Sequence, residues 1–212
     1  MLKRTPAGTL TVLAITGLAL GAVLVGPVQA GPQTVAAKKA VAAPRFLSAA
    51  ELPPHPSSSW TAGKVTDGVP EELRPCLDEA LLAYDSRYRA FRTDLDTGAW
   101  QLTVVVGGAA KAKALATRLN EEIRTCADRL EERDPEIEAT HRNYGTLPVE
   151  EGARVHGLHT SASWGASDIS LLSVGRDGRT VTVVKWAQLG DFDDAPVKAF
   201  KKTTTTAVNK LY

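Results

Sequence analysis

The chain has 212 residues, of which 43% are hydrophobic, and it balances 25 Lys and Arg against 24 Asp and Glu. This length and composition predict a single globular domain with a sizeable core. Because the net charge is close to zero, the chain has no basic surplus to attract nucleic acid or an anionic membrane surface, and neither is expected as a partner.

The first 30 residues have the pattern of an export signal. Lys3 and Arg4 provide positive charge, an apolar run follows over residues 10–25, and small residues precede a cleavage site after Ala30. A membrane span needs roughly 20 apolar residues, and this run is shorter. We therefore expect cleavage, and a protein that is secreted or lies on the outer face of the cell envelope. An uncleaved anchor that keeps the protein at the membrane is the alternative.

The folded domain is expected to span residues 45–212, after a disordered leader over residues 31–44 that lacks hydrophobic periodicity. At its start, Ser48 and Glu51 have the spacing of a capping box, which predicts a short helical turn. Further along, Pro75 falls inside a helical pattern and is expected to divide it into two short pieces.

Alternating apolar and polar side chains predict the strands of an antiparallel sheet. These strands cover residues 87–95, 100–106, 138–145, 153–163, 168–176 and 179–187. The last two are joined by Asp177-Gly178, a pair typical of a type I′ hairpin turn, in which Arg176 would pair with Arg179.

The last predicted hairpin is apolar on both faces. One face carries Leu172, Val174, Val181 and Val183, and the other carries Ile169, Leu171, Val184 and Trp186. Both faces therefore need cover. Helices can cover one of them, and the sequence does not show what covers the other.

Two main helices are predicted by apolar stripes at helical spacing. The first follows Gly107-Gly108, and the second follows Asp193 and Asp194, which are expected to cap it. Hairpin-joined strands with separate helices predict an α+β fold: a single domain with an antiparallel sheet of about five or six strands, packed with two main helices.

The chain has two cysteines, Cys76 and Cys126. In an exported chain they are most simply one disulfide, which would close a loop of about 50 residues and contribute roughly 4 kcal/mol. Two buried thiols or a reactive thiol are the alternatives. No C-x-x-C spacing indicates redox or metal chemistry.

Patterns for catalysis or for metal and cofactor binding are weak. His156 and His159 point to opposite faces of one predicted strand, and no pair of histidines or cysteines has the spacing of a zinc site. A metal site from His141, His156 and Asp168 is therefore not favoured. The serines near His159 lack the G-x-S-x-G elbow of a serine hydrolase. We therefore expect no catalytic residue, no metal and no cofactor.

Trp164 stands out because it lies in a loop of small residues, 163–167. Aromatic side chains and a few polar groups commonly line ligand pockets. Trp164 therefore predicts a ligand-binding cleft over the second face of the sheet, with the other members of the site behind it: Ile169, Leu171, Val184 and Trp186. Ordinary packing of these residues in the core is the alternative.

Several motifs occur in an order that resembles one protein family. They are Phe46-Leu47, Glu51-Leu52-Pro53, Trp60, Cys76, the strand and helix over residues 100–126, and Val174–Val181 (VGRDGRTV). Across residues 45–212 this order is similar to that of the PknH-like extracellular sensor domains of actinobacterial envelopes. The resemblance implies an exported α+β domain with a cleft for an unidentified ligand and no established catalysis.

The chain departs from the kinase-linked members of that family. It holds no kinase domain and no membrane-spanning link to one, so signalling across the membrane would need a partner. It also has a single pair of cysteines where those members have more. No site residue of the family is carried over to this chain.

The sequence therefore predicts an exported, non-catalytic sensor-type domain that binds an unidentified small molecule or cell-envelope component. Two other functions stay open. An envelope protein–protein interaction module would show a large exposed apolar patch and no pocket. A secreted hydrolase would show a pocket that joins a histidine to a serine or a carboxylate within hydrogen-bond reach.

Overall fold

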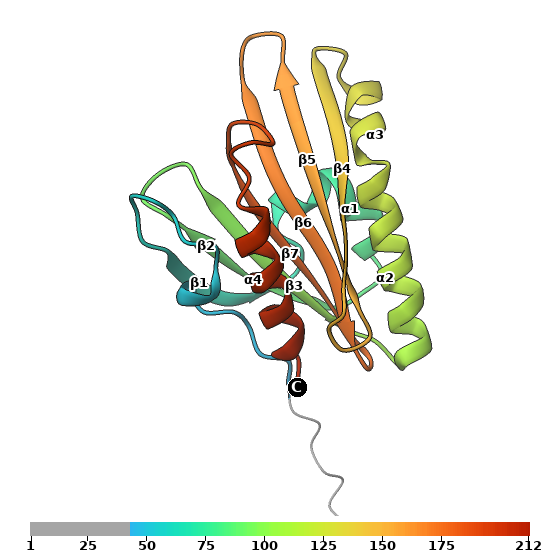
Figure 1. Ribbon diagram of the computed structural model, residues 1–212. Coiled ribbons are helices and arrows are strands. Elements are labelled where there is room, and N and C mark those ends of the chain that lie inside the picture. The colour runs from blue at the N-terminus through green and yellow to red at the C-terminus, as the bar shows by residue number, and fades with distance from the viewer. Residues whose placement is uncertain (1–42) are drawn as a thin grey trace, which may run out of the picture. The chain divides into compact units, whose positions relative to one another are not determined.

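The computed structural model describes residues 43–212, so the expected export signal and nearly all of the expected leader lie outside the described residues. Within residues 43–212, no helix is both long enough and apolar enough to cross a membrane. The described part of the chain holds one antiparallel sheet with helices on both faces (Figure 1), which confirms the α+β fold.

The sheet has seven strands in the order β1-β2-β3-β7-β6-β5-β4. They are β1 (Thr61–Asp67), β2 (Ser86–Arg92), β3 (Gly98–Val105), β4 (Ile137–Leu147), β5 (Ala153–Ala162), β6 (Ser167–Asp177) and β7 (Thr180–Leu189). The predicted five or six strands omit β1. This edge strand is almost wholly exposed, so it lacks the apolar alternation that marks a half-buried strand.

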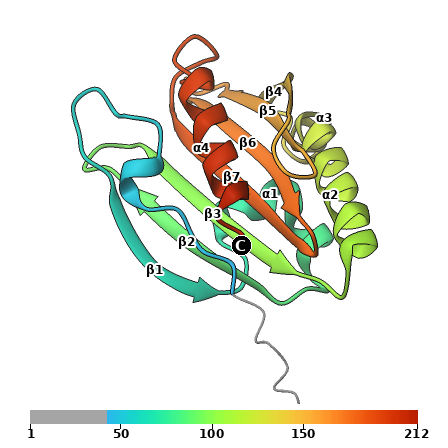
Figure 2. The same cartoon turned by 60° about the horizontal axis from the view of Figure 1, so that its bottom comes forward.

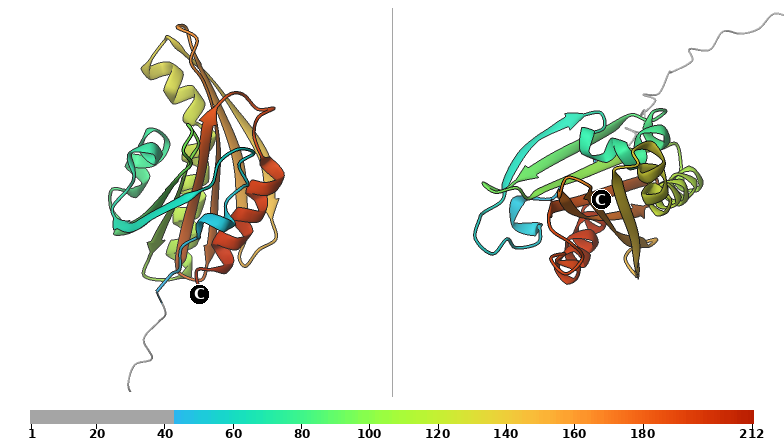
Figure 3. Two further views of the ribbon diagram at one scale, coloured as in Figure 1. Left: turned by 90° about the vertical axis from the view of Figure 1, so that its left-hand side faces the viewer. Right: turned by 90° about the horizontal axis from the view of Figure 1, so that it is seen from above.

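The helices lie in two layers, one on each face of the sheet (Figures 2 and 3). One layer holds α1 (Arg74–Leu81), α2 (Ala109–Arg124) and α3 (Cys126–Arg133). The other holds α4 (Val197–Asn209) and the short turn η1 (Ala49–Glu51). Each layer buries its own hydrophobic cluster against the sheet, so both apolar faces of the central strands are covered.

The local predictions at the two N-terminal helical segments are confirmed. The Ser48 N–H donates to Glu51 Oε2 at 2.7 Å, as a capping box requires. The second segment consists of two pieces, η2 (Glu71–Leu73) and α1. The division falls just before Pro75, which lies in the first turn of α1, where its missing N–H has no intrahelical partner to lose.

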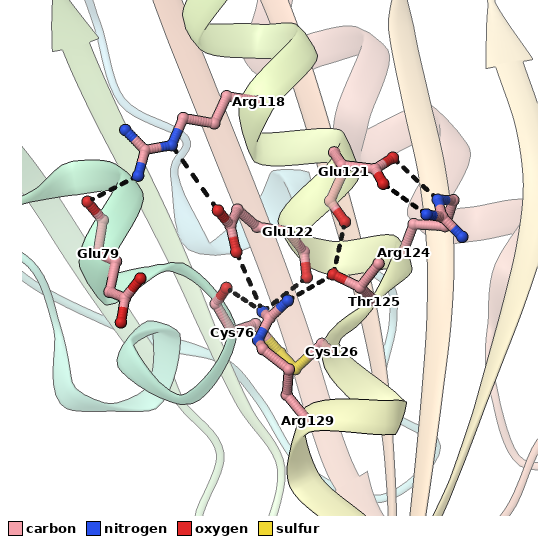
Figure 4. Close-up of polar contacts among 9 residues, drawn as sticks. All are labelled: Cys76, Glu79, Arg118, Glu121, Glu122, Arg124, Thr125, Cys126 and Arg129. Atoms are coloured by element: carbon pink, nitrogen blue, oxygen red, sulfur yellow. Dashed lines mark hydrogen bonds and ion pairs between the residues drawn. A yellow bond between two sulfur atoms is a disulfide. The ribbon is translucent and has the colours of Figure 1, made fainter. Parts of the chain in front are cut away.

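The disulfide between Cys76 and Cys126 is present and joins α1 to the start of α3, with 5.2 Å between the two Cα atoms (Figure 4). Arg129 reinforces this join, because its guanidinium donates to the Cys76 carbonyl at 3.0 Å and to the Glu122 carbonyl at 2.9 Å. The long middle helix is interrupted at Thr125, so it is two helices and not the single one predicted.

The register of the β6–β7 hairpin differs from the predicted one. Arg176 pairs with Val181, and not with Arg179, because the two loop residues are Gly178 and Arg179. Gly178 has a φ of 52°, whereas Arg179 is not among the residues with positive φ. A type I′ turn needs positive φ at both central positions, so this turn is of another type. The partner of each residue is displaced by two positions, and an even displacement keeps every side chain on its predicted face.

The start of α4 also differs from the prediction. Pro196 occupies the position before the first helical residue, and neither aspartate caps the helix. The Asp194 carboxylate instead accepts the N–H of Asp191 at 3.0 Å, so it stabilises the loop that leads into the helix.

Candidate functional site

The predicted ligand site over the second face does not come together in the structure. Its four strand residues, Ile169, Leu171, Val184 and Trp186, are 0–4% exposed and belong to the cluster under α4. Phe200 and Ala207 of α4 pack onto this cluster, as do Leu47 and Leu52 of the N-terminal segment. Trp164 is 63% exposed on the turn between β5 and β6. The cover that the sequence left unassigned is therefore the C-terminal helix.

A histidine and a serine do meet on β5 and β6, since His159 Nε2 lies 2.9 Å from Ser167 Oγ. The Ser167 hydroxyl donates its single proton to the Gly190 carbonyl, 3.1 Å away. His159 is then the donor in the pair, whereas a catalytic base would accept the serine proton. These hydrogen bonds are structural, because they connect β5 and β6 to the segment after β7.

A groove of about 580 Å³ opens between α2 and the adjoining parts of β4, β5 and β6. We call it the α2–β5 groove. Its lining residues are Lys113, Ala116, Thr117, Asn120, Glu121, Arg124, Thr146, Glu151, Gly152, Ala153, Arg154, Val174 and Arg176. The volume falls in the range typical of small-molecule sites.

Helical and strand periodicity bring these residues together. On α2, the groove residues from Lys113 to Arg124 recur every three or four positions, so they form one stripe beside the buried stripe of the same helix. On the sheet, Arg154 lies directly between Thr146 of β4 and Val174 of β6. Directly opposed residues point to the same face of a sheet, which here is the face that α2 covers.

A partly buried hydrogen-bond chain connects this groove to the edge strand β4. Asn120 Oδ1 lies 2.8 Å from His156 Nε2, and His156 Nδ1 lies 2.9 Å from His141 Nε2. The Asn120 amide group donates to the Ala116 carbonyl at 2.7 Å, so its oxygen is the acceptor toward His156. His156 therefore donates from Nε2 and accepts at Nδ1 from His141, which assigns the proton positions of the chain.

Both histidines of this hydrogen-bond chain have a lowered pKa, which favours the neutral form. His156 is 1% exposed. Burial lowers its pKa to about 4, and a proton on His141 and the positive charge of Arg154 each act in the same direction. Burial and the nearby Arg124 also lower the pKa of His141, against an opposing effect of Asp128. Titratable groups that are perturbed in this way gather at functional sites.

The described residues offer no cluster of three or more His, Cys, Asp or Glu side chains able to hold a metal ion. His141 and His156 do meet, but the ring nitrogen of His156 that faces His141 accepts its hydrogen bond. Asp168, the third residue weighed for a metal, lies on β6 opposite Thr160 and Leu189, away from the pair.

A second hollow, of about 520 Å³, lies beside β1, β2 and β3. It is lined by Pro44, Phe46, Asp67, Gly68, Tyr84, Asp85, Ser86, Arg87, Thr103 and Val105. Ser86 Oγ is buried there and has no hydrogen-bond partner among the described residues. The hydrogen-bond chain of Asn120, His156 and His141 borders the α2–β5 groove and not this hollow, so the hollow is the weaker candidate of the two.

Sequence reasoning missed the groove, although β5 carried a signal for it. Arg154, His156 and Leu158 alternate along one face of that strand. An arginine and a histidine on a strand face that a helix must cover indicate a site more strongly than the apolar residues beside them do. Polar groups on such a face need specific partners.

Comparisons with known proteins add little beyond the fold. No family model and no curated protein match the sequence. Among solved structures, the extracellular domain of PknH from Mycobacterium tuberculosis is similar to this chain, with a TM-score of 0.48 and 14% sequence identity. The match covers 78% of this chain and 98% of that one. We transfer neither function nor site residues at this level of similarity, and membership of the PknH-like family stays a prediction.

Proposed function

We propose that this protein is an exported, non-catalytic sensor-type domain that binds a small ligand in the α2–β5 groove. The main support for this proposal is the position of Asn120, which lines the groove and accepts a hydrogen bond from the buried, neutral His156. Through His156 and His141, the groove wall is connected to edge strand β4. A ligand that displaces Asn120 would disturb this chain, and so could change the surface at that edge.

The disulfide supports the exported part of the proposal. Structural disulfides persist in oxidising compartments and are rare in the cytosol. The bond between Cys76 and Cys126 is structural here, because Cys126 is fully buried and Cys76 is 8% exposed. Together with the export-signal pattern of the first 30 residues, it supports a binding event outside the cytoplasm.

The groove can be tested by mapping where small molecules bind. The purified protein is titrated with neutral, zwitterionic and anionic probes while backbone amide shifts are recorded by NMR. We expect shifts to centre on Thr117, Asn120 and Gly152, which line the groove from both walls. Thr117→Trp should abolish them, since Thr117 is exposed on the groove rim and a larger side chain there fills the space.

Ala114→Trp is the matched control, because Ala114 is also exposed on α2 but does not line the groove. It should leave the shifts unchanged. Probe shifts that centre elsewhere, or that survive in Thr117→Trp, would contradict the proposal.

A further inference from the structure

The α2–β5 groove concentrates positive charge in a protein that is otherwise almost neutral. Four cationic side chains line it, Lys113, Arg124, Arg154 and Arg176, against two carboxylates, Glu121 and Glu151. The excess of two positive charges exceeds the formal net charge of the whole chain, which is +1. Such a local excess raises the concentration of anions at the groove.

Two of the four cations are already neutralised by groove carboxylates. Arg124 donates twice to Glu121, at 2.9 and 2.5 Å (Figure 4). Arg176 lies 3.8 Å from Glu151, which also accepts the N–H of Gly178. Because Arg124 and Arg176 are already paired with carboxylates, we do not expect them to be the groups that bind a ligand.

The other two cations, Lys113 and Arg154, form no ion pair and no side-chain hydrogen bond within residues 43–212. Lys113 comes from α2 and Arg154 from β5, so they line opposite walls of the groove. The backbone of Arg154 is fixed in the sheet, because it is paired with Thr146 and Val174 on the two neighbouring strands.

The charge of Arg154 has a second consequence for the site. It lies two residues from the buried His156, on the same face of β5, and disfavours a proton on that ring. An anion on Arg154 would offset this charge. At Arg154 the groove wall therefore favours the binding of a negatively charged group and disfavours the binding of a positively charged one.

We propose that the α2–β5 groove binds a small anion through phosphate or carboxylate oxygens held between Lys113 and Arg154. The proposal rests on the proposed function, because it names the ligand class of the same groove. The Arg154 guanidinium matches two oxygens of a phosphate or carboxylate group, and the Lys113 ammonium adds a point charge from the facing wall. Thr117 and Thr146 also line the groove, and each has a hydroxyl that can donate to an anion.

The test uses pyrophosphate, citrate and the neutral sugar trehalose as probes of the purified protein at low ionic strength. Pyrophosphate and citrate distinguish a phosphate ligand from a carboxylate ligand. We expect at least one of them to bind and to shift the amides of the groove, and trehalose not to. Arg154→Gln should weaken that binding about tenfold, and Lys113→Gln somewhat less, because each removes a charge-assisted contact.

Two variants control for the general effect of a lost positive charge. Lys111→Gln is matched to Lys113→Gln, since both residues are exposed on α2 and only Lys113 lines the groove. Arg92→Gln is matched to Arg154→Gln, since Arg92 is exposed on β2. Both controls should change the affinity less than about twofold.

Three results would overturn the proposal. Equal losses in the groove variants and their controls would show only diffuse attraction of anions. Binding to vesicles that contain phosphatidylglycerol, with no binding of pyrophosphate or citrate, would make the partner an anionic membrane. Shifts of the groove amides by trehalose alone would exclude an anionic ligand but would leave the groove as a binding site.

A different result would count against the proposed function itself, namely that no probe shifts the amides of the groove.

Discussion

The two faces of the sheet differ in how completely they are closed. Under α4, strand residues such as Leu171 and Trp186 are buried in one cluster with Phe200, and the polar side chains buried on this face, such as Thr204 and Ser173, are hydrogen-bonded to each other. Under α2, the apolar layer is continuous near Leu119 and Ile123, but it ends at Asn120 and His156, beside the groove. Both faces bury an apolar cluster that stabilises the fold, and the comparison shows that a site can form at the margin of a face where its helix leaves the sheet partly uncovered.

The largest expected effect concerns the covalent join on the α2 face. Replacing both cysteines by serine, in Cys76→Ser with Cys126→Ser, should lower the free energy of unfolding by about 4 kcal/mol, because the disulfide closes a loop with a sequence separation of 50. Urea denaturation measures this loss. Ser163→Ala, at an exposed position on the β5–β6 turn, is the control and should change stability by less than about 0.5 kcal/mol. An unchanged urea midpoint in the double variant would contradict a structural role for the bond.

The next effect tests the α4 face. Leu171→Ala removes a fully buried side chain from the cluster under α4 and should cost about 3 kcal/mol of stability, since the cavity cannot collapse completely. The amide shifts caused by pyrophosphate or citrate should nevertheless be retained in this variant below its melting temperature. Loss of those shifts in a folded Leu171→Ala protein would return the ligand site to the face that the sequence first indicated.

A comparable effect is expected from pH, and it arises from the α2 face. The pKa of His156 is about 4 in the folded protein against an ordinary value of 6.5, so the unfolded chain binds more protons between these two values. The free energy of unfolding is therefore highest above about pH 6.5 and falls as the pH decreases toward 4, by up to about 3 kcal/mol from this residue.

Urea denaturation from neutral pH to about pH 4 measures that loss. His156→Gln should reduce it, because glutamine can keep hydrogen bonds to Asn120 and His141 without taking up a proton. His55→Gln, in the polar loop before β1, is the matched control and should retain the pH dependence of the parent protein. An identical pH dependence in the parent and His156→Gln proteins would show that the ring is not held neutral by the fold.

Much of the fold could be predicted because its signals are local. The strands that alternate, the capping box at Ser48 and the effect of Pro75 all depend on neighbouring residues. The pairing in the hairpin at Gly178 differs from the predicted one by two residues, and the assignment of faces survived because side chains alternate with a period of two. Strand β1 escaped prediction because an exposed edge strand needs no apolar pattern.

The candidate site could not be predicted in the same way, because it depends on which helix covers which face. Both faces of β6 and β7 are apolar, so composition did not show that α4 would close the one near Trp186. The groove arises only where residues 113–124 meet strands that follow more than 20 residues later in the chain. The interruption at Thr125 was likewise hidden, since the apolar spacing continues from Ile123 to Cys126 across it.

The most direct test of the account is the location of bound probe molecules, mapped by amide shifts in the parent protein and in Thr117→Trp. The account predicts shifts at Asn120 and Gly152 in the parent protein, their loss in Thr117→Trp and their retention in Ala114→Trp. Shifts confined to the turn around Trp164, or unchanged when the groove is filled, would contradict it.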